Sequence, residues 1–425
     1  MSQNSLFLQA LTQANAQQDD AVIATVVQVE GSAYRRPGAR MLIWSDGQSV
    51  GMISGGCLES EVCKKAQWLT RDSNPCLRRY STGQAPDDPE SVLADDEETL
   101  AFGLGCNGTV SVLFERLHSP SMQQVSKLLQ QVQHSHRAGV IATVIKGTSK
   151  TSGDCDLKLG DRILLDPVQH ELIWCGHSSK LSPALSQQIH NDLIFTLTRQ
   201  KSLHQCYAID DPKSDNPKND TLINHGVDHS PNPSSSYPTS IELFIEYVPP
   251  PNRLVIFGAG HDAQPLVSMA KIQGWHVTVI DSRAHFAQRQ RFMGADEVRH
   301  IDLKDLTALH GLHDWLKGAA VTVMTHSLSQ DRHWLGYLLA NPPRYIGQLG
   351  PRYRTERLVH ELQQASTDAS ALDAGLEVLH YPIGLDLGGD TPEAIALAIM
   401  AEITAVMNQR SGKMLKQRSY SIHAE

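Results

Sequence analysis

The chain has no long hydrophobic run: nowhere in its 425 residues is there a stretch of the roughly 20 apolar residues that a membrane-spanning helix needs. Its polar N-terminus also lacks the positively charged segment and apolar core of a secretory signal. These absences predict a cytoplasmic protein that makes no contact with a membrane.

Cysteine is scarce and irregularly spaced, with seven residues and no Cys-x-x-Cys pair. This pattern excludes a secreted disulfide framework and a structural zinc knuckle, so reduced thiols are expected. Basic residues are fewer than acidic ones: the chain has 37 Lys and Arg and 46 Asp and Glu, which gives a net charge of −9. The negative balance disfavours nonspecific binding to nucleic acid. It leaves room for a local basic site.

The length exceeds what one hydrophobic core normally organises and predicts more than one domain. Residues 210–240 are rich in Pro, Ser, Asn and Asp, which is typical of a linker or surface loop. A strand is expected after it, at residues 241–247. We expect an N-terminal domain at 1–209, a linker or surface loop at 210–250, a C-terminal domain at 251–410 and a tail at 411–425.

The first half contains a short internal repeat: VIATVV at residues 22–27 returns as VIATVI at residues 140–145. Each copy follows a helix-like segment and precedes further strand candidates, at 40–44 after the first copy and at 162–165 and 171–175 after the second. Six residues can also match by chance among β-rich sequences. An α+β domain is expected, and both a duplicated and an unduplicated version remain open.

The second half alternates short apolar runs with helical stretches, which predicts an α/β fold with a Rossmann-like, doubly wound parallel sheet. The expected strands are residues 254–257, 276–280, 321–324, 345–349 and 376–381.

A glycine turn between the first of these strands and a helical stretch is the main nucleotide-binding signal. Gly258 supplies a tight turn, Gly260 lets the backbone approach a pyrophosphate, and Ala263 allows close packing of helix on strand. A phosphate would lie on the helix N-terminus. The next strand ends at Asp281, where an acidic residue commonly binds a ribose hydroxyl. This series predicts a Rossmann-type domain but does not identify the ligand.

Two further segments reach the same predicted crevice. The strand at 321–324 leads to His326 at the carboxyl edge of the sheet. Its imidazole could be a proton shuttle, a metal ligand or a contact to a phosphate or pterin, or it could only cap the strand. In the turn at 382–390, the glycines and Asp386 could border the crevice. Alternatively the turn only prepares the helix that Thr391 is suited to cap.

Two glycine loops of the first half each present a cysteine, Cys57 and Cys106. Before them, residues 31–41 place Arg35, Arg36 and a third arginine around a turn. Glycines beside a cysteine free backbone amides and expose the sulfur, and nearby arginines can bind phosphate or lower the pKa of a thiol. One such cysteine would normally be a small buried hydrophobe. Two in similar loops favour a functional role.

These segments together resemble the XdhC/CoxI family, accessory proteins for xanthine dehydrogenase and carbon monoxide dehydrogenase. The resemblance spans both halves, because several independent motifs occur in the same order. They are the turn at 31–41, SGGCLE at 54–59, GC at 105–106, FGAGH at 257–261, DSR at 281–283, MTHS at 324–327, YIG at 345–347 and PIGLD at 382–386. The chain departs from the family pattern at Pro351 and in the insertion at 210–240.

The resemblance implies binding of molybdenum cofactor, that is, molybdopterin in its mononucleotide or dinucleotide form. It also implies protection of the cofactor during terminal sulfuration and its insertion into a xanthine-dehydrogenase-type molybdenum hydroxylase apoenzyme. A cysteine desulfurase is a further expected partner, and a homodimer an expected assembly. Cys57 and Cys106 would contact the molybdenum. The expected cofactor-binding residues are Arg35, Arg36, Gly55, Gly56, Cys57, Glu59, Cys106, Gly258, Gly260, His261, Asp281, Arg283, Thr325, His326 and Asp386.

Other functions remain open on the residues alone, although an accessory protein without catalytic residues is the leading expectation. The glycine turn would also suit an NAD(P)-dependent oxidoreductase, with Asp281 selecting the nucleotide and His326 as the acid–base group. A nucleotidyltransferase-like enzyme that modifies the cofactor is a third hypothesis, but the sequence carries no separate triphosphate-binding motif.

Overall fold

The computed structural model describes residues 3–56, 58–81, 99–101, 108–147, 157–166, 169–175, 181–209, 239–305, 311–313, 315–366 and 369–417. The chain divides into two compact units, an N-terminal unit that ends at Pro250 and a C-terminal unit that begins at Pro251. Within these described ranges, no helix is long and apolar enough to cross a membrane.

The N-terminal unit combines two β-sheets with four helices among its described residues. Its elements are α1 (Gln3–Gln17), β1 (Ala21–Gly31), β2 (Arg40–Trp44), β3 (Ser49–Gly51), α2 (Glu59–Leu69), β4 (Cys76–Ser81), β5 (Thr99–Ala101), β6 (Gly108–Arg116), α3 (Pro120–Ser135), β7 (Gly139–Lys146), β8 (Arg162–Leu165), β9 (Leu172–Cys175), α4 (Pro183–Arg199), β10 (Leu203–Ile209) and β11 (Thr239–Val248).

The two sheets of this unit share one strand order. The first sheet runs β3-β2-β1-β6-β4-β5, and the second, read from β9, runs β9-β8-β7-β11-β10. All corresponding strand pairs are antiparallel, and β5 is an extra edge strand parallel to β4. The helices correspond as well, since α1 and α3 precede the central strands and α2 and α4 follow β3 and β9. The repeats at 22–27 and 140–145 lie in the two central strands, so the N-terminal unit is an internal duplication.

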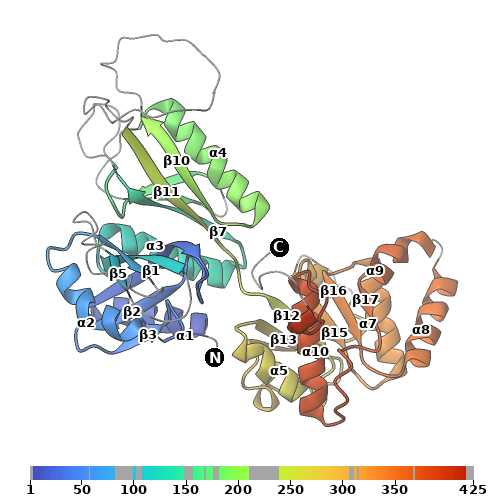
Figure 1. Ribbon diagram of the computed structural model, residues 1–425. Coiled ribbons are helices and arrows are strands. Elements are labelled where there is room, and N and C mark those ends of the chain that lie inside the picture. Colours follow the sequence, from blue (N-terminus) through green and yellow to red (C-terminus); the bar gives the residue numbers. More distant parts are fainter. Residues whose placement is uncertain are drawn as a thin grey trace. The chain divides into compact units, whose positions relative to one another are not determined.

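The two halves of the duplication share a core. Ile23 and Ile141, which hold the same place in the repeat, are buried in one hydrophobic cluster, and Val27 and Ile145 in another. Because side chains alternate along a strand, the other face of each central strand packs separately. That face is covered by α2 in the first half and by α4 in the second. In Figure 1, α4 lies along β7 and β11.

The C-terminal unit is built on a parallel sheet of order β14-β13-β12-β15-β16-β17. The direction of winding reverses between β12 and β15, which makes the carboxyl ends of these strands the expected edge of a binding crevice. The elements are β12 (Arg253–Phe257), α5 (Ala263–Ile272), β13 (His276–Asp281), η1 (Arg289–Arg291), β14 (Glu297–His300), β15 (Ala320–Val323), α7 (Leu328–Ala340), β16 (Tyr345–Gln348), α8 (Arg352–Ala365), η2 (Ala369–Leu372), α9 (Asp373–Glu377), β17 (Leu379–His380), α10 (Pro392–Met407) and η3 (Leu415–Gln417).

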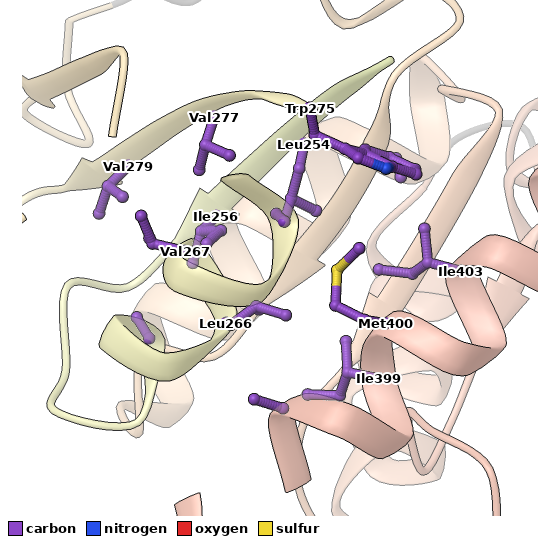
Figure 2. Close-up of a cluster of buried hydrophobic side chains, with 14 of the residues drawn as sticks. Leu254, Ile256, Leu266, Val267, Trp275, Val277, Val279, Ile399, Met400 and Ile403 are labelled. Carbon is purple, nitrogen blue, oxygen red and sulfur yellow. The ribbon is translucent and has the colours of Figure 1, made fainter. Parts of the chain in front are cut away.

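Both faces of this sheet are buried, as is usual for parallel sheets. Leu254 and Ile256 of β12 point toward α5 and α10 (Figure 2), where they contact a cluster that includes Met400. Val255 and Phe257 belong to the cluster on the opposite face, with α7. The strands therefore have continuous apolar sequences. The predicted fold class is confirmed, with a Rossmann-like parallel sheet in the C-terminal unit and an α+β fold in the N-terminal unit.

The structure corrects two sequence predictions and adds strands that were not predicted. The strand expected at residues 241–247 is confirmed as β11, but it lies between β10 and β7, so it belongs to the N-terminal unit and not to a linker. Residues 210–238 of the predicted linker lie outside the described residues. Only Leu379 and His380 of the predicted strand at 376–381 are extended, because α9 continues to Glu377. The strands that were not predicted are β3, β4, β5, β6, β10 and β14.

Candidate functional site

The arginine loop, residues 31–41, connects β1 to β2. Two backbone hydrogen bonds close it, from the Val26 N–H to the Ala39 carbonyl (2.9 Å) and from the Gly38 N–H to the Val26 carbonyl (2.8 Å). Gly38 has a φ of +95°, which side-chain-bearing residues rarely adopt. Arg35 is partly exposed and Arg36 exposed. Neither guanidinium has a hydrogen-bond or ion-pair partner among the described residues, which leaves both available to an anion.

A turn at residues 53–59 is held together by Glu59. Its carboxylate accepts hydrogen bonds from the N–H groups of Ile53 (3.2 Å) and Ser54 (2.7 Å) and from the Ser54 hydroxyl. The Ser54 oxygen in turn accepts from the Leu58 N–H at 3.1 Å. Burial alone would raise the pKa of Glu59, but these hydrogen bonds outweigh it and hold the pKa below its ordinary value. Glu59, predicted as a cofactor contact, thus holds the turn that contains Cys57.

Three segments meet at one end of the first sheet. The Tyr34 ring of the arginine loop lies against Gly55, where an added Cβ would be 3.4 Å from the ring. Gly108 pairs with Gly31 in the β1–β6 ladder, and a Cβ on it would collide with the Ser32 carbonyl. The arginine loop therefore touches both the turn that contains Cys57 and the strand that follows Cys106.

The two cysteines themselves, Cys57 and Cys106, lie outside the described residues. Within the described ranges, no group of three or more His, Cys, Asp or Glu side chains could hold a metal ion. The predicted sulfur contacts to molybdenum therefore stay predictions.

In the C-terminal unit the glycine turn has the predicted backbone. Gly258 has a φ of +120°, and a Cβ on it would collide with the Met324 carbonyl, so only glycine fits between β12 and β15. Its N–H donates to the Ile280 carbonyl (2.8 Å). His261 is exposed. The N–H groups of Gly260, His261 and Asp262 have no acceptor in the described part of the chain.

Asp262, which the sequence analysis did not assign, occupies the space above Gly260. A Cβ on Gly260 would overlap its carboxylate and would lie 3.7 Å from the His326 ring. The other carboxylate oxygen is 2.8 Å from His326 Nε2. His326 is mostly exposed, with 62% of its side chain accessible, whereas Asp262 has 17%. His326 also has a φ of +58°, which is unusual for a non-glycine residue. The pair spans the two strand ends at which the sheet reverses.

The predicted ribose-binding acid, Asp281, is engaged within the protein. Its side chain is buried and accepts hydrogen bonds from the Ala259 N–H (2.8 Å) and from the backbone and guanidinium of Arg283 (2.8–2.9 Å). Burial alone would raise the pKa of Asp281, but these donors outweigh it and lower the pKa. Arg283 also lies 4.0 Å from the centroid of the Phe286 ring. A ribose hydroxyl would have to compete with Arg283 for this carboxylate.

Thr325 is also occupied. It is buried, and its hydroxyl donates to Asp331 at 2.5 Å. Asp331 also accepts from the Gln348 amide (3.2 Å) and from Arg354 of α8 (2.5 Å). This network fixes the end of β15, and so the backbone of His326, without placing Thr325 in the crevice.

Asp386 is exposed and has no partner among the described residues. The turn before it is anchored to α10, because the Gly384 N–H donates to Glu402 (2.8 Å) and the Leu385 N–H to the Ala398 carbonyl (3.2 Å). The Thr391 side chain accepts from the Ala394 N–H and caps α10. The segment is therefore at least a helix start, with Asp386 free to meet a ligand.

Sequence reasoning missed residues that act across elements. Asp262 looked like an ordinary residue of the glycine motif, and its partner His326 is 64 positions away. Arg291 was also missed: its guanidinium donates to the Ala259 carbonyl of the glycine turn (2.9 Å) and lies 5.0 Å from the Phe286 centroid. The run of arginines after Asp281 was the available signal for a basic flank.

Comparisons with known proteins match both units. A family model of the XdhC Rossmann domain matches residues 254–403, and a model of the XdhC and CoxI family matches residues 14–81. The chain is 28% identical over 388 residues to a probable xanthine dehydrogenase subunit of Bacillus subtilis (strain 168), covering 91% of this chain and 93% of that protein. It is 27% identical over 113 residues to the molybdenum cofactor insertion chaperone PaoD of Escherichia coli (strain K12), covering 26% of this chain and 31% of that protein.

A solved structure is similar along nearly the whole chain. The crystal structure of a xanthine dehydrogenase from Bacillus halodurans has a TM-score of 0.63 and 26% sequence identity, and the match covers 98% of both chains.

Proposed function

Because this chain belongs to the XdhC and CoxI family, we propose that it is an accessory protein for a xanthine-dehydrogenase-type molybdenum hydroxylase. In this proposal it binds molybdenum cofactor as its cargo, protects it during terminal sulfuration and inserts it into the apoenzyme. The relative PaoD, whose name describes such a chaperone, supports the insertion role.

One observation carries the proposal: the arginine loop meets the two segments that flank the cysteine positions. Arg35 and Arg36 are unpaired within the described residues, and a guanidinium matches the geometry of a phosphate. Above Gly56 no described atom lies within 4 Å of an added Cβ, so this side of the turn is open. These residues fit the phosphate of a molybdopterin, and Cys57 and Cys106 are the proposed soft ligands for its metal.

In the C-terminal unit the glycine turn is the proposed cradle for the nucleotide or phosphate end of a cargo. The unpaired N–H groups of Gly260, His261 and Asp262 support an anion at the N-terminus of α5. Asp262 must turn away for such a group to reach them, since its carboxylate lies over Gly260. His326, Arg283 and Asp386 are the proposed side-chain contacts around this cradle.

The oxidoreductase alternative has less support from the geometry. The acid that would select NAD, Asp281, is buried and bonded to Arg283 and to the Ala259 N–H. The Asp262–His326 pair is the observation that favours it, because a carboxylate next to an imidazole is a common acid–base arrangement. A cysteine desulfurase partner and a homodimer remain part of the proposal as expected assemblies.

The test is coexpression of a xanthine-dehydrogenase-type apoenzyme with this chain, with an Arg35→Ala/Arg36→Ala variant and with no accessory protein. We expect full molybdenum content with the wild-type chain and reduced content with Arg35→Ala/Arg36→Ala or without the accessory protein, measured by metal analysis of the purified enzyme. An Arg71→Ala variant is the matched control, because that arginine is exposed and lies on the Trp68 ring, away from the arginine loop. Equal loading in all samples would defeat the insertion role.

A further inference from the structure

The duplication in the N-terminal unit places two Arg–Glu pairs in equivalent positions. Arg40 stands opposite Thr25 and Arg162 opposite Thr143, the same position of the repeat. Their partners are equivalent too, since Glu115 stands opposite Ile23 and Glu246 opposite Ile141.

Each pair crosses from one half of the duplication to the other. Arg40 of the first half binds Glu246 of the second, with 2.8 Å between Nη1 and Oε1 and a second contact from Nη2. Arg162 of the second half binds Glu115 of the first. Both pairs are buried, with side-chain exposures of 10% and 8% in the first and 3% and 1% in the second. The two halves are thus linked by two reciprocal ion pairs.

The two pairs hold loops with different surroundings. Counted back from the arginine, the positions of Arg35 and Arg36 in the first half are those of Leu157 and Lys158 in the second. Leu157 is buried. Two adjacent arginines at these positions therefore occur in the first copy and not in the second. Among the described residues, the two equivalent loops thus differ at these two positions, exposed or partly exposed arginines in the first half and a buried leucine followed by an exposed lysine in the second.

Glu246 reaches into the arginine loop itself. A Cβ on Gly38 would be 2.7 Å from Glu246 Oε1, and Arg40 also donates to the Gly38 carbonyl at 3.0 Å. The Glu246 carboxylate therefore packs against Gly38. It also accepts two hydrogen bonds from Arg40, which itself donates to the Gly38 carbonyl. The loop's last turn, which contains Gly38, follows Arg35 and Arg36 directly in the sequence, so its position constrains the backbone from which both arginines extend.

We propose that Glu246 is a positioning residue for the arginine loop: the second half of the duplication sets the geometry with which the first half binds a phosphorylated ligand. The inference rests on the proposed function for the ligand's identity. It goes beyond it in assigning the second half, which contributes no predicted ligand residue, a part in binding.

The test replaces whole pairs, because removing one partner of a buried ion pair leaves a charge uncompensated, whereas apolar replacement of both is often neutral or stabilising. The variants are Arg40→Met/Glu246→Leu and its symmetric control, Arg162→Met/Glu115→Leu. Both are expected to fold, as checked by circular dichroism and thermal unfolding. Molybdenum cofactor released from a purified molybdenum enzyme is the probe.

We expect the first double variant to bind the cofactor about tenfold more weakly, since losing a well-placed charged hydrogen bond costs roughly that factor. The control should bind as the wild type does. Equal affinity of both double variants for the cofactor, whether lowered or unchanged, would overturn the inference.

A second measurement does not depend on the cofactor. Trypsin should cleave after Arg35 faster in Arg40→Met/Glu246→Leu than in the wild type, and after Lys158 faster in the control, as followed by mass spectrometry. A wild-type chain that binds no cofactor would refute the proposed function and leave this arm decisive for Glu246. Unchanged cleavage after Arg35 in the first double variant would refute the positioning role.

Discussion

Asp262 changes how Gly260 is understood. The sequence suggested that glycine is needed there for a pyrophosphate to approach the backbone, but in this structure the carboxylate of Asp262 occupies the space over Gly260. A Gly260→Val variant would displace the Asp262 side chain and also block the backbone, so a loss of ligand binding would not identify its cause. The informative substitution is therefore at Asp262.

We predict that Asp262→Ala binds a pyrophosphate-containing nucleotide such as ADP-ribose about tenfold more tightly than the wild type, because it removes a negative charge and a steric block beside the α5 N-terminus. Isothermal titration calorimetry measures this. Asp262→Asn keeps the shape and removes the charge, so it separates the two causes. No gain in either variant would argue against a phosphate site at this turn.

Asp281 gives a prediction in which the sign of the pH dependence is fixed. Its pKa is lowered in the folded state, so its stabilising contribution is complete above the ordinary carboxyl pKa of about 4. The contribution is lost as the pH falls through the lowered folded-state pKa. Asp281→Asn should therefore destabilise the protein by about 1–3 kcal/mol at pH 7. The gap from the wild type should shrink below about pH 4 in thermal unfolding. A gap that is constant with pH would contradict the charged hydrogen bonds.

The two cysteines of the predicted glycine loops give a further prediction. We predict that Cys57→Ala and Cys106→Ala each lower the molybdenum content of the copurified cofactor by more than half, because a thiolate is a good soft ligand. Cys175→Ala is the control, since that side chain is buried and burial raises the pKa of its thiol. If both variants, Cys57→Ala and Cys106→Ala, retain full cofactor content, these cysteines do not bind the metal and contribute only to packing.

At the scale of elements, helix α10 begins with a Thr-Pro start that the sequence predicted. Its Thr391 side chain accepts a hydrogen bond from the Ala394 N–H at 3.2 Å. Thr391→Ala should cost about 1 kcal/mol of unfolding free energy, as N-cap losses usually do, measured by urea denaturation. Thr391→Ser, which keeps the hydroxyl, should restore nearly all of it. A loss as large in the serine variant would show that the hydroxyl is not the cause.

Many elements with a strong apolar pattern were predicted, although the buried strand β6 was not, and elements defined by their neighbours could not be predicted. The buried strands β12, β13 and β15 came directly from their apolar runs. The edge strand β14, Glu-Val-Arg-His, has no such run and pairs only with β13. Residues 376–381 looked like a strand, but the first two of them complete α9. Packing against α7 and η2, which local sequence cannot show, decides that segment.

The candidate site was predictable in its glycines and less so in its side chains. Gly258 and the arginine loop followed from turn chemistry. Glu59, Thr325 and Asp281 were predicted as ligand contacts because they lie in the motifs, yet each makes hydrogen bonds that hold its own turn. Such roles depend on which donors fold back onto a carboxylate or hydroxyl, and that geometry is set by tertiary structure.

At the scale of the whole molecule, a Rossmann-like unit does not by itself make an enzyme. We predict that the purified chain shows no NAD(P)-linked turnover with xanthine or small hydroxy acids, because Arg283 occupies the carboxylate that would bind the ribose. Absorbance of the reduced nicotinamide follows the reaction, and a known dehydrogenase under the same conditions is the control. Robust turnover that disappears in His326→Ala would instead establish the oxidoreductase function.

The crossed Arg–Glu pairs also bear on the history of the chain. In a dimer of identical protomers every mutation appears twice, so neither copy of a loop can change without the other. A gene that carries both copies in tandem removes that constraint and keeps the two ion pairs that link the halves. One copy can then carry arginines at 35 and 36 while the other carries leucine and lysine at the equivalent positions. The second half is then free to serve as a scaffold for the first.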